Sequence, residues 1–149
     1  AWTTTGGGAT TLHTHAAAPA TVLTQAGLTL WSTPATGEIG YVSGNDTLTK
    51  CIATSLAAAR FFGAYAGTAS TVTIAGVVPM FFVPGLTSIT AGTPVFISAA
   101  TAGNVTKTAP STSGQVVAEV GLLLDGASYN NGAGSAHDVL IQVKPPVLL

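Results

Sequence analysis

The sequence has very few charged residues. Only 6% of its 149 residues are Asp, Glu, Lys or Arg, whereas an ordinary soluble domain carries about 25%. The formal net charge is −1, below the magnitude of about 2 to 8 that keeps a small domain from associating. The surface must therefore consist mostly of Thr, Ser, Ala, Gly and Asn. Because such a surface offers little electrostatic resistance to being covered by another protein, we expect the chain to work within an assembly.

The scarcity of cations and of long apolar runs excludes two classes of partner. Phosphate binding needs clustered Lys and Arg side chains, and the four cations, Lys50, Arg60, Lys107 and Lys144, are scattered along the chain. The longest apolar run, at 74–86, contains two prolines and is shorter than the roughly 20 residues of a membrane-spanning helix. We therefore expect neither a nucleic acid nor a membrane as partner.

Cysteine is also scarce, and the first residues are not expected to form a secretory leader. Cys51 is the only cysteine, so no disulfide can form within the chain. The first ten residues, AWTTTGGGAT, have neither the basic nor the apolar segment of a secretory signal peptide. We expect synthesis in the cytoplasm.

Catalytic motifs are absent. The sequence contains no G-x-S-x-G, H-E-x-x-H, Walker or G-x-G-x-x-G pattern of the kind that marks common active sites. His137 and Asp138 are adjacent, but neighbours on a strand point to opposite faces, which is poor geometry for a base and its orienting carboxylate. We expect no enzymatic activity and no cofactor.

His13 and His15 are the only weak candidates for a metal site. On an extended strand the two imidazoles would lie on the same side, where both could ligate one metal ion. The alternative, which we prefer, is that they are two polar residues of a flexible segment, so we expect no metal.

The first part of the chain differs from the rest. Residues 1–35 are rich in Thr, Gly and Ala and show no sustained period of 2 or 3.6, which is typical of an extended N-terminal arm. The segment TVLTQAGLTLW, at 21–31, alternates loosely and predicts a lead-in strand. We expect a β domain over 36–149, because short runs rich in Val, Ile, Thr, Phe and Tyr alternate there with Gly, Asn and Pro.

A weak internal sequence repeat suggests that this domain consists of two similar units. Two units, about 37–80 and 92–146, share an order of strand, glycine turn, strand, loop, strand and apolar strand. The matched segments are GYVS at 40–43 with VFIS at 95–98, GNDTLTK at 44–50 with GNVTK at 103–107, Gly63 with Gly121, and TVTIAGVVP at 71–79 with DVLIQVKPP at 138–146. In both turns Gly-Asn is expected to supply the positive φ.

Two further segments bear on the architecture. Ala, Leu and Arg in 55–67 favour a helix, but its two glycines and the repeat favour a strand after a turn. The segment GASYNNGAGSAHD, at 126–138, has no counterpart in the first unit and is expected to be a surface loop. We predict an all-β fold, a compact β-barrel or β-sandwich in which two similar units share one core, preceded by the arm.

The second unit resembles a known family. The segment AGTPVFISAATAGNVTKTAPSTSGQVVAEVGLLLDG, at 91–126, is similar to a pattern in the capsid decoration proteins of tailed bacteriophages, which are also called cement or head-stabilisation proteins. The resemblance implies a β-tulip-like body, often a homotrimer, that binds the major capsid protein on the outer surface of an icosahedral head. It places the protein on the capsid exterior of the virion, after synthesis in the host cytoplasm.

The arm is the expected contact with the capsid. Family arms order on the shell and add a strand to a capsid-protein sheet, and a Thr-rich and Gly-rich arm can supply the main-chain groups for such β-augmentation. Trp2 would act as an apolar anchor, and we list Trp2, Thr3, Thr4, Thr5 and Leu12 as partner-binding candidates.

Other interpretations stay open. The protein could be a tail, neck or fibre component whose loop at 126–138 contacts a receptor or glycan through Tyr129, Asn130 and Asn131. A non-viral β module from a bacterial surface is a third possibility.

Overall fold

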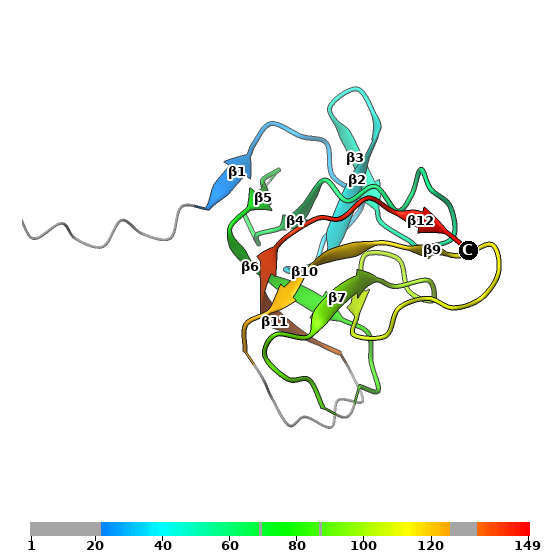
Figure 1. Ribbon diagram of the computed structural model, residues 1–149. Helices are drawn as coiled ribbons and strands as arrows, with labels where there is room; N and C mark the ends of the chain where they lie inside the picture. Colours follow the sequence, from blue (N-terminus) through cyan, green and yellow to red (C-terminus); the bar gives the residue numbers. More distant parts are fainter. Residues whose placement is uncertain (1–21, 69, 87, 126–133) are drawn as a thin grey trace, which may run out of the picture.

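The computed structural model describes residues 22–68, 70–86, 88–125 and 134–149. Within these ranges the chain is all-β and contains no helix (Figure 1), which confirms the predicted fold class. The alanine-rich segment 55–67 forms turns followed by a strand, as predicted, and not a helix. Among the described residues there is accordingly no helix with the length and apolarity needed to cross a bilayer.

The first half of the body forms a five-stranded sheet in the order β1-β5-β4-β2-β3. Its strands are β1 (Leu23–Gln25), β2 (Ile39–Gly44), β3 (Thr47–Lys50), β4 (Gly63–Tyr65) and β5 (Val72–Ala75). All pairs within the sheet are antiparallel. A parallel bridge between Thr29 and Thr47 also links the segment after β1 to the far edge of the sheet. The sheet is therefore joined across its two ends by one bridge.

The second half forms a closed five-stranded barrel in the order β10-β11-β6-β8-β7. Its strands are β6 (Val77–Phe82), β7 (Pro94–Ile97), β8 (Val105–Thr106), β10 (Glu119–Leu123) and β11 (Ser135–Ile141). Closure comes from β6, which pairs antiparallel with β11 along six residue pairs and parallel with β8 at Phe82 and Val105. A closed barrel is one of the architectures that the sequence predicts, and it leaves no free strand edge.

A small third sheet completes the body. β9 (Val116–Val117) pairs antiparallel with β12 (Val147–Leu148), so the last strand lies beside the segment that leads into β10. Figure 1 shows β12 and the C-terminus at the opposite side of the body from β1.

One predicted boundary is wrong. Residues 135–138, which the sequence analysis assigns to a surface loop, form the start of β11. The segment SAHD has no bulky apolar residue that would signal a strand, but its backbone pairs with β6, where Ser135 lies opposite Phe82 and Asp138 opposite Pro79. Backbone pairing with a buried neighbour extends the strand despite the polar side chains.

Both halves contribute to one hydrophobic core. Ile39 and Ala64 of the first sheet and Met80, Phe82 and Val120 of the barrel are all fully buried in the same cluster. β6 shows why, because every second residue of VVPMFF is buried, as expected for a strand with one face on the core.

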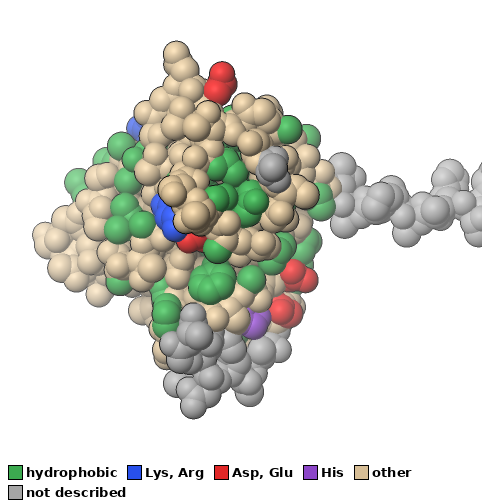
Figure 2. Space-filling view, turned by 180° about the vertical axis from the view of Figure 1, so that it is seen from behind, with side chains coloured by type: hydrophobic (Ala, Val, Ile, Leu, Met, Phe, Trp, Pro, Cys, Tyr) green, Lys and Arg blue, Asp and Glu red, His purple; other side chains and the backbone are tan. Residues whose placement is uncertain are grey.

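The surface is poor in charge. Figure 2 shows few Lys, Arg, Asp or Glu side chains among polar and apolar ones on the face that it presents. Nine large apolar side chains of the described residues are more than 40% exposed: Val22, Leu23, Val42, Leu56, Leu124, Val143, Val147, Leu148 and Leu149.

Candidate functional site

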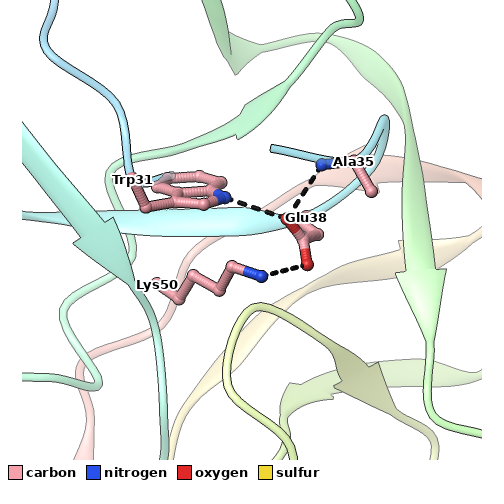
Figure 3. A network of polar contacts seen from close by, with 4 residues as sticks. All are labelled: Trp31, Ala35, Glu38 and Lys50. Atoms are coloured by element: carbon pink, nitrogen blue, oxygen red, sulfur yellow. Dashed lines mark hydrogen bonds and ion pairs between the residues drawn. The ribbon is translucent and has the colours of Figure 1, made fainter. Parts of the chain in front are cut away.

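The buried polar network around Glu38 lies where the two halves meet (Figure 3). The Glu38 carboxylate accepts hydrogen bonds from the Trp31 indole N–H at 2.9 Å and the Ala35 N–H at 2.9 Å. Lys50 forms an ion pair with its other oxygen at 2.5 Å. The next residue, Ile39, links the first sheet to the barrel, because its N–H donates to the carbonyl of Gly103, in the turn between β7 and β8, at 2.8 Å.

The electrostatics of Glu38 fit a structural role. Burial raises the pKa of this carboxyl, but the hydrogen bonds from Lys50, Ala35 and Trp31 and the charge of Lys50 outweigh it, so that the pKa lies below its ordinary value. The carboxylate therefore stays ionised, with its oxygens occupied by protein donors. A group held in this way stabilises the fold and is not free to act as a general base.

A second polar cluster unites residues that the sequence analysis considered separately. Ser135 Oγ lies 2.7 Å from His137 Nε2, and Asp125 Oδ2 lies 3.2 Å from His137 Nδ1. Ser135 and His137 are two residues apart on β11, so their side chains lie on the same face of the strand. His137 also packs edge-on against the ring of Phe82.

This cluster has the hydrogen-bond order of a serine-nucleophile triad. Sequence reasoning weighed His137 only against Asp138, and the structure pairs it with Asp125 instead. The pattern Ser-x-His on a strand is the signal that could have found the contact. Catalysis by such a group also needs a cleft that holds a substrate, and neither of the clefts of the described residues discussed next is lined by Ser135, His137 or Asp125.

Two clefts of the described residues are open to solvent. The first, about 270 Å³, is lined by Phe61, Val143 and two prolines, together with the charged residues Arg60, Glu119 and Lys144. The second, about 400 Å³, lies among short Ser, Thr and Ala side chains near Ser98. In the first cleft the carboxylate of Glu119 is paired with Lys144 at 2.8 Å, and the second is lined by no titratable side chain, so that neither presents an acid, a base and a nucleophile together. Among the described residues there is also no group of three His, Cys, Asp or Glu side chains that could hold a metal ion.

Cys51 is not a reactive thiol. Its side chain is fully buried in the core, and this burial raises the pKa of the thiol well above its ordinary value. The thiolate, which is the nucleophile and the metal ligand, is therefore not formed at neutral pH.

The remaining predicted site residues cannot be placed. The arm candidates Trp2, Thr3, Thr4, Thr5 and Leu12, the histidines His13 and His15, and the loop candidates Tyr129, Asn130 and Asn131 all lie outside the described residues. The lead-in strand predicted within 21–31 is present as β1. What the described residues offer for function is thus a low-charge surface with exposed apolar side chains.

No family model, curated protein or solved structure matches this chain.

Proposed function

We propose that this chain is a structural virion protein, a capsid decoration or cement protein that binds the outer surface of an icosahedral phage head. It would stabilise the head by bridging neighbouring capsid subunits, without chemistry. The observation that carries the proposal is the combination of a net charge of −1 with nine large apolar side chains that are exposed among the described residues of an all-β body. A surface with exposed apolar side chains and few charges suits contacts with other proteins, whose central parts are depleted of charged residues.

The physical logic is that of repeated weak contacts. Exposed apolar residues near both ends of the body, such as Leu23 of β1 and Leu148 of β12, would each contribute modestly to a contact. Icosahedral symmetry presents many identical sites, so that such contacts sum into avidity. The partners in this proposal are the major capsid protein and further copies of the chain in a homotrimer, on the capsid exterior.

The arm remains part of the proposal. Residues 1–21, with Trp2 and Leu12, would order on the shell and add a strand to a capsid-protein sheet. The cost of ordering the arm would be met only where the mature shell offers that edge. β1, which immediately follows, already lies at the edge of a sheet.

We propose further that the body is a doubled unit, with β2, β3, β4 and β5 equivalent to β7, β8, β10 and β11. The registers support it, because pairs aligned by the sequence repeat are also paired strand to strand in each half. The equivalent pairs are Tyr41–Thr49 with Phe96–Thr106, Gly40–Gly63 with Val95–Gly121, and Tyr65–Val72 with Leu123–Val139. β1 and β6 then occupy equivalent places, since each pairs antiparallel with the last strand of its unit.

The proposed function is tested by adding the purified protein to expanded heads from which decoration protein has been stripped. We expect it to bind and to raise the temperature at which the heads release DNA. Deleting residues 1–20 should weaken binding at least tenfold while the circular dichroism spectrum of the body is unchanged. The matched control is Tyr129→Ala, which should bind as the parent does. Failure of the full chain to bind any such shell would overturn the proposal.

A tail, neck or fibre component is the second candidate. It is favoured by the contacts of His137 with Asp125 and Ser135, because they tie together the chain on both sides of 126–134. A loop whose ends are fixed in this way suits a receptor or glycan contact. In that case the triple variant at Tyr129, Asn130 and Asn131 should abolish binding to cells, and the arm deletion should not.

A further inference from the structure

β1 is held in the body almost entirely by its backbone. Its three residues pair with β5, with a register irregularity between Leu23 and Thr24, and every one of them is exposed. Leu23 is 54% exposed, and Val22, just before the strand, is 42% exposed. Detaching β1 from β5 would therefore break hydrogen bonds but uncover little apolar side-chain surface of β1 itself.

The chain after β1 has the features of a hinge. Gly27 has a φ of +78°, and a Cβ at this position would meet no atom within 4 Å, so no neighbouring group is packed against that side of the chain. Two residues later the chain is fixed, because the Thr29 N–H donates to the Asp46 carbonyl at 2.7 Å and the Leu48 N–H donates to the Thr29 carbonyl at 2.8 Å. The segment before Thr29 can thus move away from β5 while the contacts of Thr29 with Asp46 and Leu48 are kept.

The edge that β1 would leave must be filled again. In β5, Val72 and Thr73 are buried, and the strand would be left with an unpaired backbone edge, which is a template for another strand. The strand that fits this edge best is an identical β1, because it carries the same register irregularity and the same side chains. An exchanged element makes in a second copy the contacts that it made in its own.

We propose that β1 is exchanged between copies of this chain, so that residues 22–25 of each copy pair with β5 of a neighbour. Three features favour exchange over self-pairing. The linker between β1 and Thr29 is short, and short linkers favour domain swapping. The net charge of −1 gives little repulsion between copies, and a neighbouring body would cover the exposed side chains of Val22 and Leu23. The inference concerns the free protein and does not rest on the proposed function.

The test uses disulfide trapping, since Leu23 and Ala75 are Cα partners in the β1–β5 pair. Directly opposed residues of antiparallel strands lie about 4.5–5.5 Å apart, within the range that a disulfide spans. The full-length Leu23→Cys and Ala75→Cys variants are co-expressed, purified together and mildly oxidised. We expect a covalent dimer that contains one chain of each variant. Cys51 is buried, so the parent chain should give no dimer.

The control replaces Leu23→Cys by Leu148→Cys, because Leu148 has the same exposed fraction, 54%, on another strand. Mixed dimer formed with Ala75→Cys should be at least tenfold less abundant in this control. The double variant Leu23→Cys/Ala75→Cys should form covalent oligomers. If it forms only an internal disulfide within one chain, and the mixed variants form no more dimer than the control, β1 stays in its own body and the proposal is wrong.

Lengthening the hinge gives a second, independent measurement. Insertion of Gly-Ser-Gly-Ser after Ala26 should let β1 fold back on its own β5 easily, and the mass in solution by light scattering should fall to that of a monomer. A parent that is already monomeric, or an insertion variant that keeps the oligomeric mass of the parent, would count against exchange.

Discussion

The two halves of the body each contain a five-stranded sheet, and the sheets differ in how their ends are joined. In the barrel, β6 spans six residues and buries Val78, Met80 and Phe82 between β11 and β8. In the first sheet, β1 has three exposed residues, and a single bridge from Thr29 reaches β3. The same place in the pairing order is thus filled once by a core strand and once by a strand on the surface. The strand at this place in the barrel is therefore held by buried side chains, and that in the first sheet mainly by its backbone pairing.

The largest effect should come from removing the core side chain of the closing strand. Phe82→Ala deletes a fully buried ring, and such substitutions cost about 3–5 kcal/mol. Phe81→Ala, on the neighbouring and only partly buried position of β6, is the matched control and should cost less than half as much. Urea unfolding followed by fluorescence measures both. Equal losses would mean that β6 does not close the barrel through its inward face.

The next largest difference is expected between Gly121 of the barrel and Gly63 of the first sheet, when each is replaced by Ala. A Cβ at Gly121 would lie 2.2 Å from the Leu140 carbonyl oxygen and 2.7 Å from Val139, whereas at Gly63 the nearest atom, the Thr73 oxygen, lies at 2.9 Å. We expect Gly121→Ala to cost about 3 kcal/mol, at the upper end of overpacking effects, and Gly63→Ala about half of that. The melting temperatures of the two variants test this order, and a reversed order would contradict the tighter packing of the barrel.

The ion pairs Glu38–Lys50 of the first half and Glu119–Lys144 of the second should contribute differently to the free energy of unfolding. Glu38→Gln leaves Lys50 without its ion pair inside a network of three donors, and hydrogen bonds to charged groups contribute about 1.5–3 kcal/mol. Glu119→Gln, the control, breaks a pair in which the carboxylate is as buried as that of Glu38, 12% against 11% exposed, but the lysine, Lys144, is 65% exposed. Pairs with a solvent-exposed partner contribute about 0–1 kcal/mol. Chemical denaturation at pH 7 should therefore separate the two variants.

The pH dependence has a definite sign. Because the pKa of Glu38 is depressed in the folded state, its contribution is fully present above the ordinary value of 4.5 and is lost as the pH falls through the folded pKa. The difference in unfolding free energy between the parent and Glu38→Gln should be constant from pH 7 to about 5 and shrink at lower pH. A difference that is unchanged at pH 3 would contradict the assignment.

Local patterns predicted the class of fold because they are set by nearby residues. Alternating apolar residues and the spacing of Gly and Pro identified the β fold, and the glycines of 55–67 excluded a helix. The prediction that Gly-Asn supplies the positive φ of both turns is only half right. In the first turn the positive φ falls on Asp46 and not on Gly44 or Asn45, whereas in the second it falls on Gly103, as predicted. A type of turn constrains its composition, but several residues in it can adopt the left-handed region.

Long-range pairing was the part that sequence could not supply. The sequence analysis ended the first unit at residue 80, but β6 hydrogen-bonds to β11 and β8 of the second half. Nothing in VVPMFF specifies its partners, since a strand pairs through backbone groups that every residue carries. The meeting of His137 with Asp125 depends in the same way on the pairing of β10 with β11, and so the adjacent Asp138 was the only carboxylate weighed against it.

The smallest expected effect is in β1 and its flank, and it tests the contrast with β6 most directly. Val22→Ala and Val78→Ala remove the same two methyl groups, from a side chain 42% exposed and from one 2% exposed. At about 0.8 kcal/mol for each buried carbon, Val78→Ala should cost roughly 2 kcal/mol, and Val22→Ala should stay within about 0.5 kcal/mol, as surface substitutions do. Denaturant titration at low protein concentration, where chains are separate, gives both values. If the free-energy cost of Val22→Ala rises with protein concentration, the Val22 side chain is buried between copies, as strand exchange requires. If the cost is as large as that of Val78→Ala even in the separate chain, Val22 belongs to the core, and the proposed difference between β1 and β6 is wrong.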